Sequence, residues 1–134
     1  MEECGSKFPL IEDITMSVAR KYGMIQPGES TTKAVRVVFF IDPSSIIRAI
    51  IYNPLSLERN FEELKIVIIG LQTADKFAIA TPADWQPGED VIVPTAGSCG
   101  VAEDLMSVKK NGGLYYKDWF FCMKPLAKEK VLEH

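Results

Sequence analysis

The side chains of this sequence that could carry out covalent chemistry are its cysteines. There are three of them, Cys4, Cys99 and Cys122, and no CxxC or Cys/His spacing joins any of them into a metal site. An odd number of cysteines without a secretory signal is typical of free thiols in a reducing cytosol. The sequence therefore predicts a cytoplasmic protein that binds no metal and no other cofactor.

Histidine offers no alternative nucleophile or base. The one histidine, His134, lies in the terminal "LEH". This ending resembles the stub of a vector-encoded polyhistidine tag, so residues 132–134 are interpreted as a tag remnant. Without His134 the chain cannot form a His-based triad, dyad or zinc site by itself, because each of these needs an imidazole.

A cation stands at a position that could hold a ligand. In the stretch "NPLSLERNFEEL", at 53–64, Arg59 ends a proline-containing loop directly before a predicted helix. Asn60 and Glu63 have the spacing of a capping box, which predicts that the helix begins there. A guanidinium supplies charge and five donors but cannot act as nucleophile or base. The alternative interpretation is a solvated arginine among acidic neighbours.

Composition limits the remaining classes of function. The chain has 134 residues, 47% of them hydrophobic, and a net charge of -3. This length suits one ordinary domain with a modest core. The negative charge argues against a nucleic-acid partner, because such domains usually carry a basic surface. No run of 18 or more apolar residues occurs, so we expect no membrane span.

The elements that must position these residues follow in α+β order. Asp13 is expected to cap the first helix and Gly23 to end it. Strands are predicted at 7–11, 34–42, 46–53, 91–93 and within 115–126, and helices within 14–23, 60–77 and 101–113. The strands at 34–42 and 46–53 should form a hairpin that is apolar on nearly both faces. Such a hairpin needs cover on both sides and is an aggregation hazard without it.

Three stretches of the sequence resemble the peroxiredoxins. They are "FPLIED…VARKYGM", "VVFFIDPSSIIRAIIYNPLSLERNFEEL" and "LQTADKFAIATPADWQPGEDVIVP", and together they cover residues 8–94 nearly continuously. The resemblance is to the long-tailed, one-cysteine-like branch found in archaea and some bacteria. The later segment "DWFFCMKP" resembles the cysteine-bearing tail arm of archaeal members.

The resemblance implies a thioredoxin-like fold and thiol-dependent reduction of hydroperoxides. In that family the reactive cysteine lies in a Pro-x-x-x-Thr/Ser-x-x-Cys motif at a helix N-terminus. No such motif occurs in this sequence. The expectation is therefore a catalytically incomplete C-terminal part of a peroxiredoxin. Residues 1–78 would form a partial thioredoxin-like core with an incomplete sheet, and residues 79–131 a C-terminal extension that serves dimerisation.

By the same resemblance, Arg59 corresponds to the arginine that binds the peroxide and the thiolate. Cys122 corresponds to a resolving cysteine, although a small buried apolar residue is the alternative interpretation. Cys4 is expected to be a mobile terminal thiol and Cys99 to be structural or exposed. Trp85 and the aromatic segment at 115–121 could suggest a ligand site, but packing against a partner subunit is more usual for such a segment.

Several partner arrangements stay open. The resemblance implies a homodimer, with the strand at 46–53 and the tail arm as contacts. One alternative is a split enzyme, in which a separate N-terminal peroxiredoxin chain supplies the cysteine motif and Arg59 completes the site. Others are a non-enzymatic dimeric interaction module and the product of a decayed gene. Peroxidase activity of the chain alone is not expected.

Overall fold

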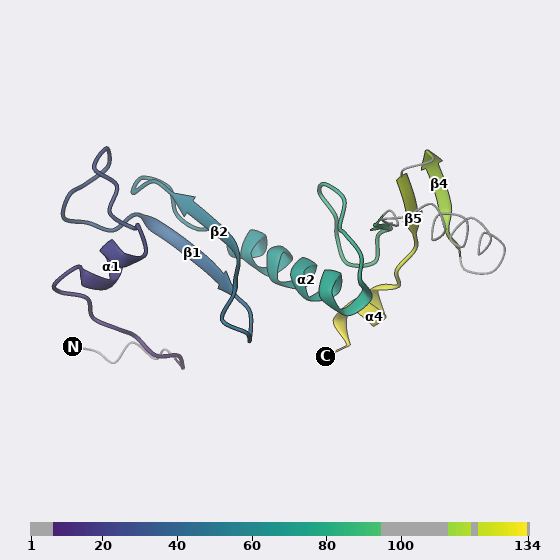
Figure 1. Cartoon of the computed structure of the whole chain (residues 1–134), viewed down its shortest axis with the longest axis horizontal. Helices are drawn as coiled ribbons and strands as arrows, with labels where there is room; N and C mark the ends of the chain where they lie inside the picture. Colours follow the sequence, from purple (N-terminus) through teal and green to yellow (C-terminus); the bar gives the residue numbers. More distant parts are fainter. Residues whose placement is uncertain (1–6, 95–112, 119–120, 134) are drawn as a thin grey trace. The chain divides into compact units, whose positions relative to one another are not determined.

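A computed structural model describes residues 7–94, 113–118 and 121–133 of the chain (Figure 1). It has mixed α and β structure, as predicted, with a two-stranded and a three-stranded sheet. The chain divides into two compact units, Met1–Arg59 and Asn60–His134. The described residues contain no helix that is long and apolar enough to cross a bilayer. The expected division at 78/79 stays a prediction.

The first helix, α1, spans Ser17–Lys21 and begins later than predicted. Its N-cap is Met16, whose backbone is left-handed with φ 58° and whose side chain makes no capping hydrogen bond. The Asp13 carboxylate instead accepts the N–H groups of Val18 at 3.2 Å and Ala19 at 2.8 Å. The predicted capping role of Asp13 is confirmed, because these are two of the orphan donors of the first turn.

Gly23 ends α1 as predicted. Its φ of 65° lies in the left-handed region, which glycine adopts without steric cost. The Gly23 N–H donates to the carbonyl of Arg20 at 3.1 Å, and the Met24 N–H donates to that of Ala19 at 2.8 Å. This pair of hydrogen bonds is a Schellman motif, which satisfies the last carbonyls of the helix.

The predicted strand at 7–11 is wrong. The segment has no β structure, and Phe8, Leu10 and Ile11 are 67%, 69% and 84% exposed. A β-strand needs a neighbour for its backbone N–H and C=O groups. No described segment pairs with residues 7–11, so the apolar, β-prone composition alone does not make a strand there.

The predicted hairpin is confirmed. Strand β1, Arg36–Ile41, pairs antiparallel with β2, Ile47–Asn53 (Figure 1), and the register is irregular between Phe40 and Ile41. In the turn, the Asp42 carboxylate accepts the N–H groups of Ser44 and Ile46 at 2.9 and 3.0 Å. Asp42 thus closes the turn by side chain-to-backbone bonds, as Asp commonly does.

Residues around α1 cover part of one face of the hairpin. The Tyr22 ring meets the Phe39 ring edge-on, with ring centroids 5.1 Å apart. The Tyr52 ring also meets Phe39 edge-on, with ring centroids 6.2 Å apart. The Tyr52 hydroxyl also donates to the Tyr22 carbonyl at 3.2 Å. Ile46 and Ile47, at the turn, remain 58% and 47% exposed, so the cover is incomplete.

Helix α2 spans Phe61–Phe77 and begins where the sequence predicts. The Asn60 side-chain oxygen accepts the N–H groups of Glu62 at 3.0 Å and Glu63 at 3.4 Å. These two bonds satisfy donors that would otherwise have no intrahelical partner. The helix ends at Ala78, whose φ of 50° leaves the right-handed region.

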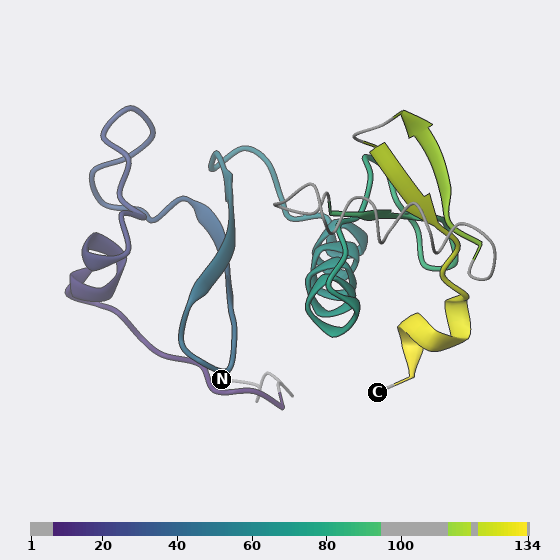
Figure 2. The same ribbon diagram turned by 45° about the vertical axis from the view of Figure 1, so that its right-hand side comes forward.

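The second sheet is built in the order β3-β5-β4, so β5 is its central strand (Figure 2). Its strands are β3, Val91–Val93, β4, Tyr115–Asp118, and β5, Phe121–Lys124. The predicted strand at 91–93 is confirmed, and the predicted extended segment within 115–126 forms two paired strands. The predicted helix within 101–113 lies almost entirely outside the described residues.

A further helix, α4, spans Lys128–Leu132 and was not predicted. It places Val131, 2% exposed, against the core of the second unit. That core consists of buried residues from five places in the sequence: Ile79, Trp85, Val91, Leu126 and Val131.

Lys76 of α2 binds the end of α4. Its ammonium donates to the Lys130 and Glu133 carbonyls at 3.4 and 2.9 Å. A lysine there suits the negative end of a helix.

Candidate functional site

The candidate site is the loop that carries Arg59, residues 54–59, which follows β2. Pro54 directly follows β2, and a turn begins there, with the Leu57 N–H donating to the Pro54 carbonyl at 3.1 Å. Arg59 is exposed at the end of this loop, immediately before the capping residue Asn60. The sequence correctly predicted this placement, because proline and the Asn cap are local signals.

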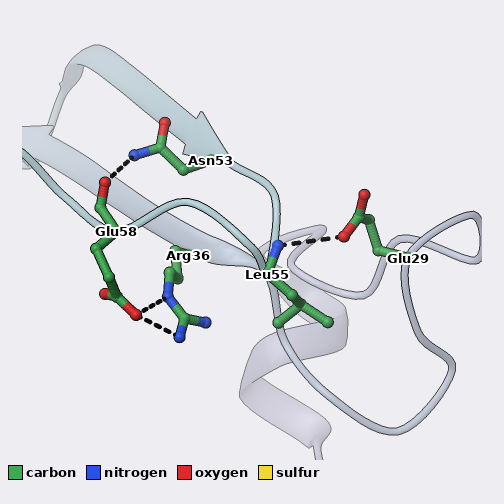
Figure 3. A network of polar contacts seen from close by, with 5 residues as sticks. All are labelled: Glu29, Arg36, Asn53, Leu55 and Glu58. Atoms are coloured by element: carbon green, nitrogen blue, oxygen red, sulfur yellow. Dashed lines mark hydrogen bonds and ion pairs between the residues drawn. The ribbon is translucent and has the colours of Figure 1, made fainter.

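Glu29 holds the beginning of the loop. Its carboxylate accepts the backbone N–H of Leu55 at 3.1 Å, across 26 positions of sequence (Figure 3). Glu29 itself lies in a turn, in which its N–H donates to the Gln26 carbonyl at 2.9 Å. A hydrogen bond to a charged acceptor is among the stronger ones in proteins. The loop is thus tied to a segment far away in the sequence.

Arg36 and Asn53 hold the other end of the loop through Glu58. The Arg36 Nε donates to Glu58 Oε1 at 2.7 Å, and Arg36 Nη2 lies 2.5 Å from the same oxygen (Figure 3). The Asn53 side-chain amide donates to the Glu58 backbone carbonyl at 3.4 Å. Arg36 and Asn53 are also cross-strand partners in the hairpin, so the strand pairing places both donors together.

The guanidinium groups of Arg36 and Arg59 both lower the pKa of the Glu58 carboxylate. The hydrogen bond from Arg36 lowers the pKa of Glu58 most, and the charge of Arg59 lowers that pKa further. The same hydrogen bond raises the pKa of Arg36. Glu58 is therefore ionised at neutral pH. No hydrogen bond joins the Glu58 carboxylate to the Arg59 guanidinium, so the latter pair interacts through charge alone.

The roles of Glu29 and Arg36 were not predicted from the sequence. Glu29 lies in a segment that the sequence marks only as a polar loop. Arg36 had a usable signal, since it is the one charged residue inside the apolar run "AVRVVFFI". A charge in a strand of that kind usually has a partner, because burying it unpaired is costly. The identity of that partner, 22 positions away, could not be read from the pattern.

Cys122 lies in the other unit and is shielded from solvent. It is 5% exposed and sits in the central strand β5, opposite Val93 of β3 and Tyr116 of β4. This burial fits the alternative interpretation of a small apolar residue. Its role as a resolving thiol stays a prediction. Cys4, Cys99 and Trp119 lie outside the described residues.

Trp85 belongs to the interior of its own unit. It is 3% exposed, packs in the core cluster, and its indole N–H donates to the Glu89 carbonyl at 3.2 Å. This burial fits a structural role for Trp85, although Trp85 also lines a groove along α2; a ligand site or a partner contact there stays a prediction. Within the described residues, no three His, Cys, Asp or Glu side chains lie close enough together to hold a metal ion.

A groove of about 780 Å³ runs along α2, but it does not offer what a peroxide site needs. Its wall includes Ile66, Val67 and Leu71 of α2, with Glu62 and Glu63 at the helix start. Among the described residues that line this groove, none is a lysine or an arginine. A site that stabilises a thiolate needs a cation or the free N–H groups of a helix N-terminus. The start of α2 lies at this groove, but the N–H groups of Glu62 and Glu63 already donate to the Asn60 side chain. The loop with Arg59 is therefore the better candidate.

Comparison with known proteins identifies the family. Residues 70–98 match the family model described as the C-terminal domain of 1-Cys peroxiredoxin. A peroxiredoxin of Methanosarcina mazei is 49% identical over 92% of this chain and 56% of its own length. Peroxiredoxin 2 of Caldanaerobacter subterraneus is 44% identical over 87% of this chain and 52% of its own length.

Solved structures agree with this. A yeast mitochondrial 1-Cys peroxiredoxin has a TM-score of 0.67 and 31% identity, over 83% of this chain and 53% of that one. A variant of peroxiredoxin 6 from Arenicola marina has a TM-score of 0.67 and 32% identity, over 85% of this chain and 54% of that one. This chain belongs to the peroxiredoxin family. It spans about half the length of the curated relatives it matches.

Proposed function

We propose that this chain supplies the peroxide-binding arginine, Arg59, to a site that reduces hydroperoxides with a thiol. The observation that carries the proposal is the loop 54–59, which is tied at one end to Glu29 and at the other to Arg36 and Asn53. A loop fixed in this way presents its cation with less conformational cost than a mobile one. Membership of the peroxiredoxin family supplies the class of reaction.

In this reaction a cysteine thiolate attacks the peroxide. An S–O bond forms, the O–O bond breaks, and the distal oxygen takes up a proton and leaves as water or an alcohol. The cysteine becomes a sulfenic acid. Arg59 would donate hydrogen bonds to the peroxide oxygens and stabilise the thiolate by its charge. The nucleophile would come from a polypeptide segment outside this sequence, because no cysteine here lies in Pro-x-x-x-Thr/Ser-x-x-Cys.

Cys122 is proposed as the thiol that resolves the sulfenic acid. Its thiolate would attack the sulfenic sulfur, form a disulfide and release water. Because the residue is 5% exposed in a central strand, this step requires the small sheet to open locally. Free thiols of this kind suit a cytoplasmic setting, which we also propose.

The test of the proposal is a fusion protein. The part of the Methanosarcina mazei peroxiredoxin that this chain does not cover is joined to this chain, and hydroperoxide consumption is measured with excess thiol. Replacing Arg59→Ala should lower kcat/KM roughly ten- to hundredfold, the loss expected for a charge-assisted hydrogen bond. Arg20→Ala is the matched control, because Arg20 is an exposed arginine of α1 outside the loop.

The proposal fails if the fusion protein consumes hydroperoxide equally well with Arg59→Ala and Arg20→Ala. It also fails if the fusion protein folds and shows no hydroperoxide consumption.

A dimeric interaction module is a second candidate function, favoured by the exposed isoleucines at the turn of the hairpin. In this alternative the chain associates through the hairpin and has no activity. A homodimer is proposed under either function.

A further inference from the structure

The thioether of Met123 lies against a hydroxyl group in the small sheet of the second unit. Met123 is in β5 and is the cross-strand partner of Tyr115 in β4. Its sulfur, Sδ, lies 3.6 Å from the Tyr115 hydroxyl oxygen. The same hydroxyl donates to Asp90 Oδ2 at 2.6 Å. Asp90 directly precedes β3, so the three strands bring a sulfur, a phenol and a carboxylate together.

Asp90 holds the one hydrogen of the Tyr115 hydroxyl. The distance of 2.6 Å is that of a hydrogen bond to a charged acceptor, whereas the contact with the sulfur is long and a thioether is a weak acceptor. The hydrogen bond to Asp90, foremost, raises the pKa of Tyr115, so the phenol keeps its proton at neutral pH. The hydrogen is directed at Asp90, which leaves the lone pairs of the sulfur nucleophilic.

A small solute reaches this sulfur by way of Asp90 and Tyr115. Met123 is 6% exposed, but Tyr115 is 38% exposed. The hydrogen bond between Tyr115 and Asp90 is exposed, and the contact between Tyr115 and Met123 is half-buried. A carboxylate accepts hydrogen bonds at about four positions, so Asp90 can accept the O–H of a hydroperoxide beside that of Tyr115. A hydroperoxide bound there is one hydroxyl group away from the sulfur.

We propose that Met123 is a site at which a thioether reduces a hydroperoxide, with Tyr115 as the proton carrier and Asp90 as the residue that orients Tyr115. Sδ attacks the terminal peroxide oxygen, an S–O bond forms and the O–O bond breaks. The sulfur gives up two electrons and becomes a sulfoxide. The Tyr115 hydroxyl donates its proton to the leaving oxygen, which departs as water or an alcohol, and takes up the proton of the attacked oxygen.

This reaction is separate from the proposed function. It uses no thiolate and no arginine, and its three residues belong to the second unit. It is read at Met123 in this chain alone, whereas the proposed function is read in the fusion protein. Failure of either one therefore leaves the other standing.

The experiment follows oxidation of individual methionines in the full chain. The chain is treated with excess hydrogen peroxide, and sulfoxide formation is measured over time by mass spectrometry of peptides. Fragmentation of the peptide that contains Met123 assigns the added oxygen to Met123 or to Cys122. Met123 should be oxidised at least as fast as Met16 and Met24, which are half-buried and hence more accessible than Met123.

The substitution Tyr115→Phe removes the proton carrier and keeps the ring. It should slow the oxidation of Met123 at least about tenfold, since a positioned proton donor contributes roughly 10²–10⁴-fold and water replaces part of this. A purely structural role of Tyr115 predicts the opposite, because a loosened sheet exposes the sulfur and speeds its oxidation. Tyr52→Phe is the matched control: it removes a hydroxyl of the other unit and should leave the Met123 rate unchanged.

A second variant keeps the test decisive if circular dichroism shows that Tyr115→Phe is unfolded. Asp90→Asn keeps an acceptor oxygen but loses the charge, so it holds the Tyr115 hydroxyl less firmly and should slow Met123 roughly two- to fivefold. The inference is overturned if Met123 stays reduced while Met16 and Met24 are oxidised. It is also overturned if the folded variant, Tyr115→Phe or its replacement, oxidises Met123 as fast as the unmodified chain or faster.

Discussion

Asn60 stabilises the start of α2 because its side-chain oxygen accepts two backbone hydrogen bonds. We predict that Asn60→Ala lowers the free energy of unfolding by about 1 kcal/mol, because two N–H groups lose their acceptor. Asn60→Asp is the matched control and should retain the stability, since Asp caps as well as Asn. Urea unfolding followed by circular dichroism at 222 nm measures both. Equal stability of the alanine and aspartate variants would contradict the prediction.

Asp13 gives the stability of the first unit a dependence on pH. The backbone N–H of Ala19, foremost, and those of Val18 and Ser17 lower the pKa of Asp13 in the folded chain. A carboxyl whose pKa is lowered on folding stabilises the folded state above its unfolded pKa, about 3.9. This contribution is lost as the pH falls through the lower, folded pKa.

We therefore predict that Asp13→Asn flattens the acid limb of the stability curve, because the variant cannot gain a proton below that pH. The measurement is the urea midpoint at pH values from about 6 down to 2, with Glu12→Gln as the control. The wild-type and Asp13→Asn curves should converge as the pH falls. Curves that stay parallel throughout this range would show that Asp13 has no such linkage.

For individual residues, the sequence predicts the roles of those whose hydrogen-bond partners are only a few positions away. Asp13, Gly23 and Asn60 were identified because a cap or a helix end involves a few consecutive positions. Glu29 and Arg36 were missed because their partners lie 26 and 22 positions away. Pairing across such distances depends on how the hairpin brings segments together, which periodicity does not encode.

Among the helices and strands, prediction succeeded where the stabilising hydrogen bonds and contacts are local in the sequence. The hairpin β1–β2 and the helix α2 are local structures with strong apolar patterns and caps, and both were predicted. The segment 7–11 has the composition of a strand, but its exposed Phe8 and Ile11 show that composition needs a neighbouring strand to take effect. Helix α4 was missed because five residues carry too little periodicity, and its stability comes from burying Val131.

The central position of β5 determines how Cys122 should react. We predict that its thiol reacts with a disulfide reagent at least about 100-fold more slowly in the native chain than in urea, because attack requires the sheet to open. The measurement uses a Cys4→Ser/Cys99→Ser background, so that Cys122 is the only thiol.

The control is the Cys4→Ser/Cys99→Ser variant that also carries Val93→Ala. Val93 faces Cys122 across the ladder, so the truncation should loosen the sheet and speed the reaction. If Cys122 reacts in the native chain as fast as in urea, the thiol is not protected by the sheet.

For the whole molecule, the hairpin predicts self-association. Ile41 and Ile47 are cross-strand partners, and with Ile46 they are 52%, 47% and 58% exposed. Ile47→Lys should weaken dimerisation roughly tenfold or more, because burying each isoleucine contributes about 1.5–3 kcal/mol and a twofold interface counts it twice. Sedimentation equilibrium over a concentration series measures the dissociation constant.

The matched control is Leu132→Lys, which replaces a similarly exposed side chain, 46%, at the end of α4. This variant should associate like the unmodified chain. A chain that stays monomeric at all concentrations would contradict the dimer, and an equal effect of both substitutions would show that the hairpin is not the contact.

The strand order β3-β5-β4 has a consequence for the chain as it leaves the ribosome. β3 pairs with β5, which is synthesised after β4, and the core that Trp85 and Val91 join also contains Leu126 and Val131. At about 5–20 residues per second, roughly two to eight seconds separate the synthesis of β3 from that of Val131. During that interval the core around Trp85 and Val91 lacks the side chains of Leu126 and Val131. Ribosome-bound chains that stop before Leu126 should therefore be cleaved by protease in this unit, while the hairpin is already protected.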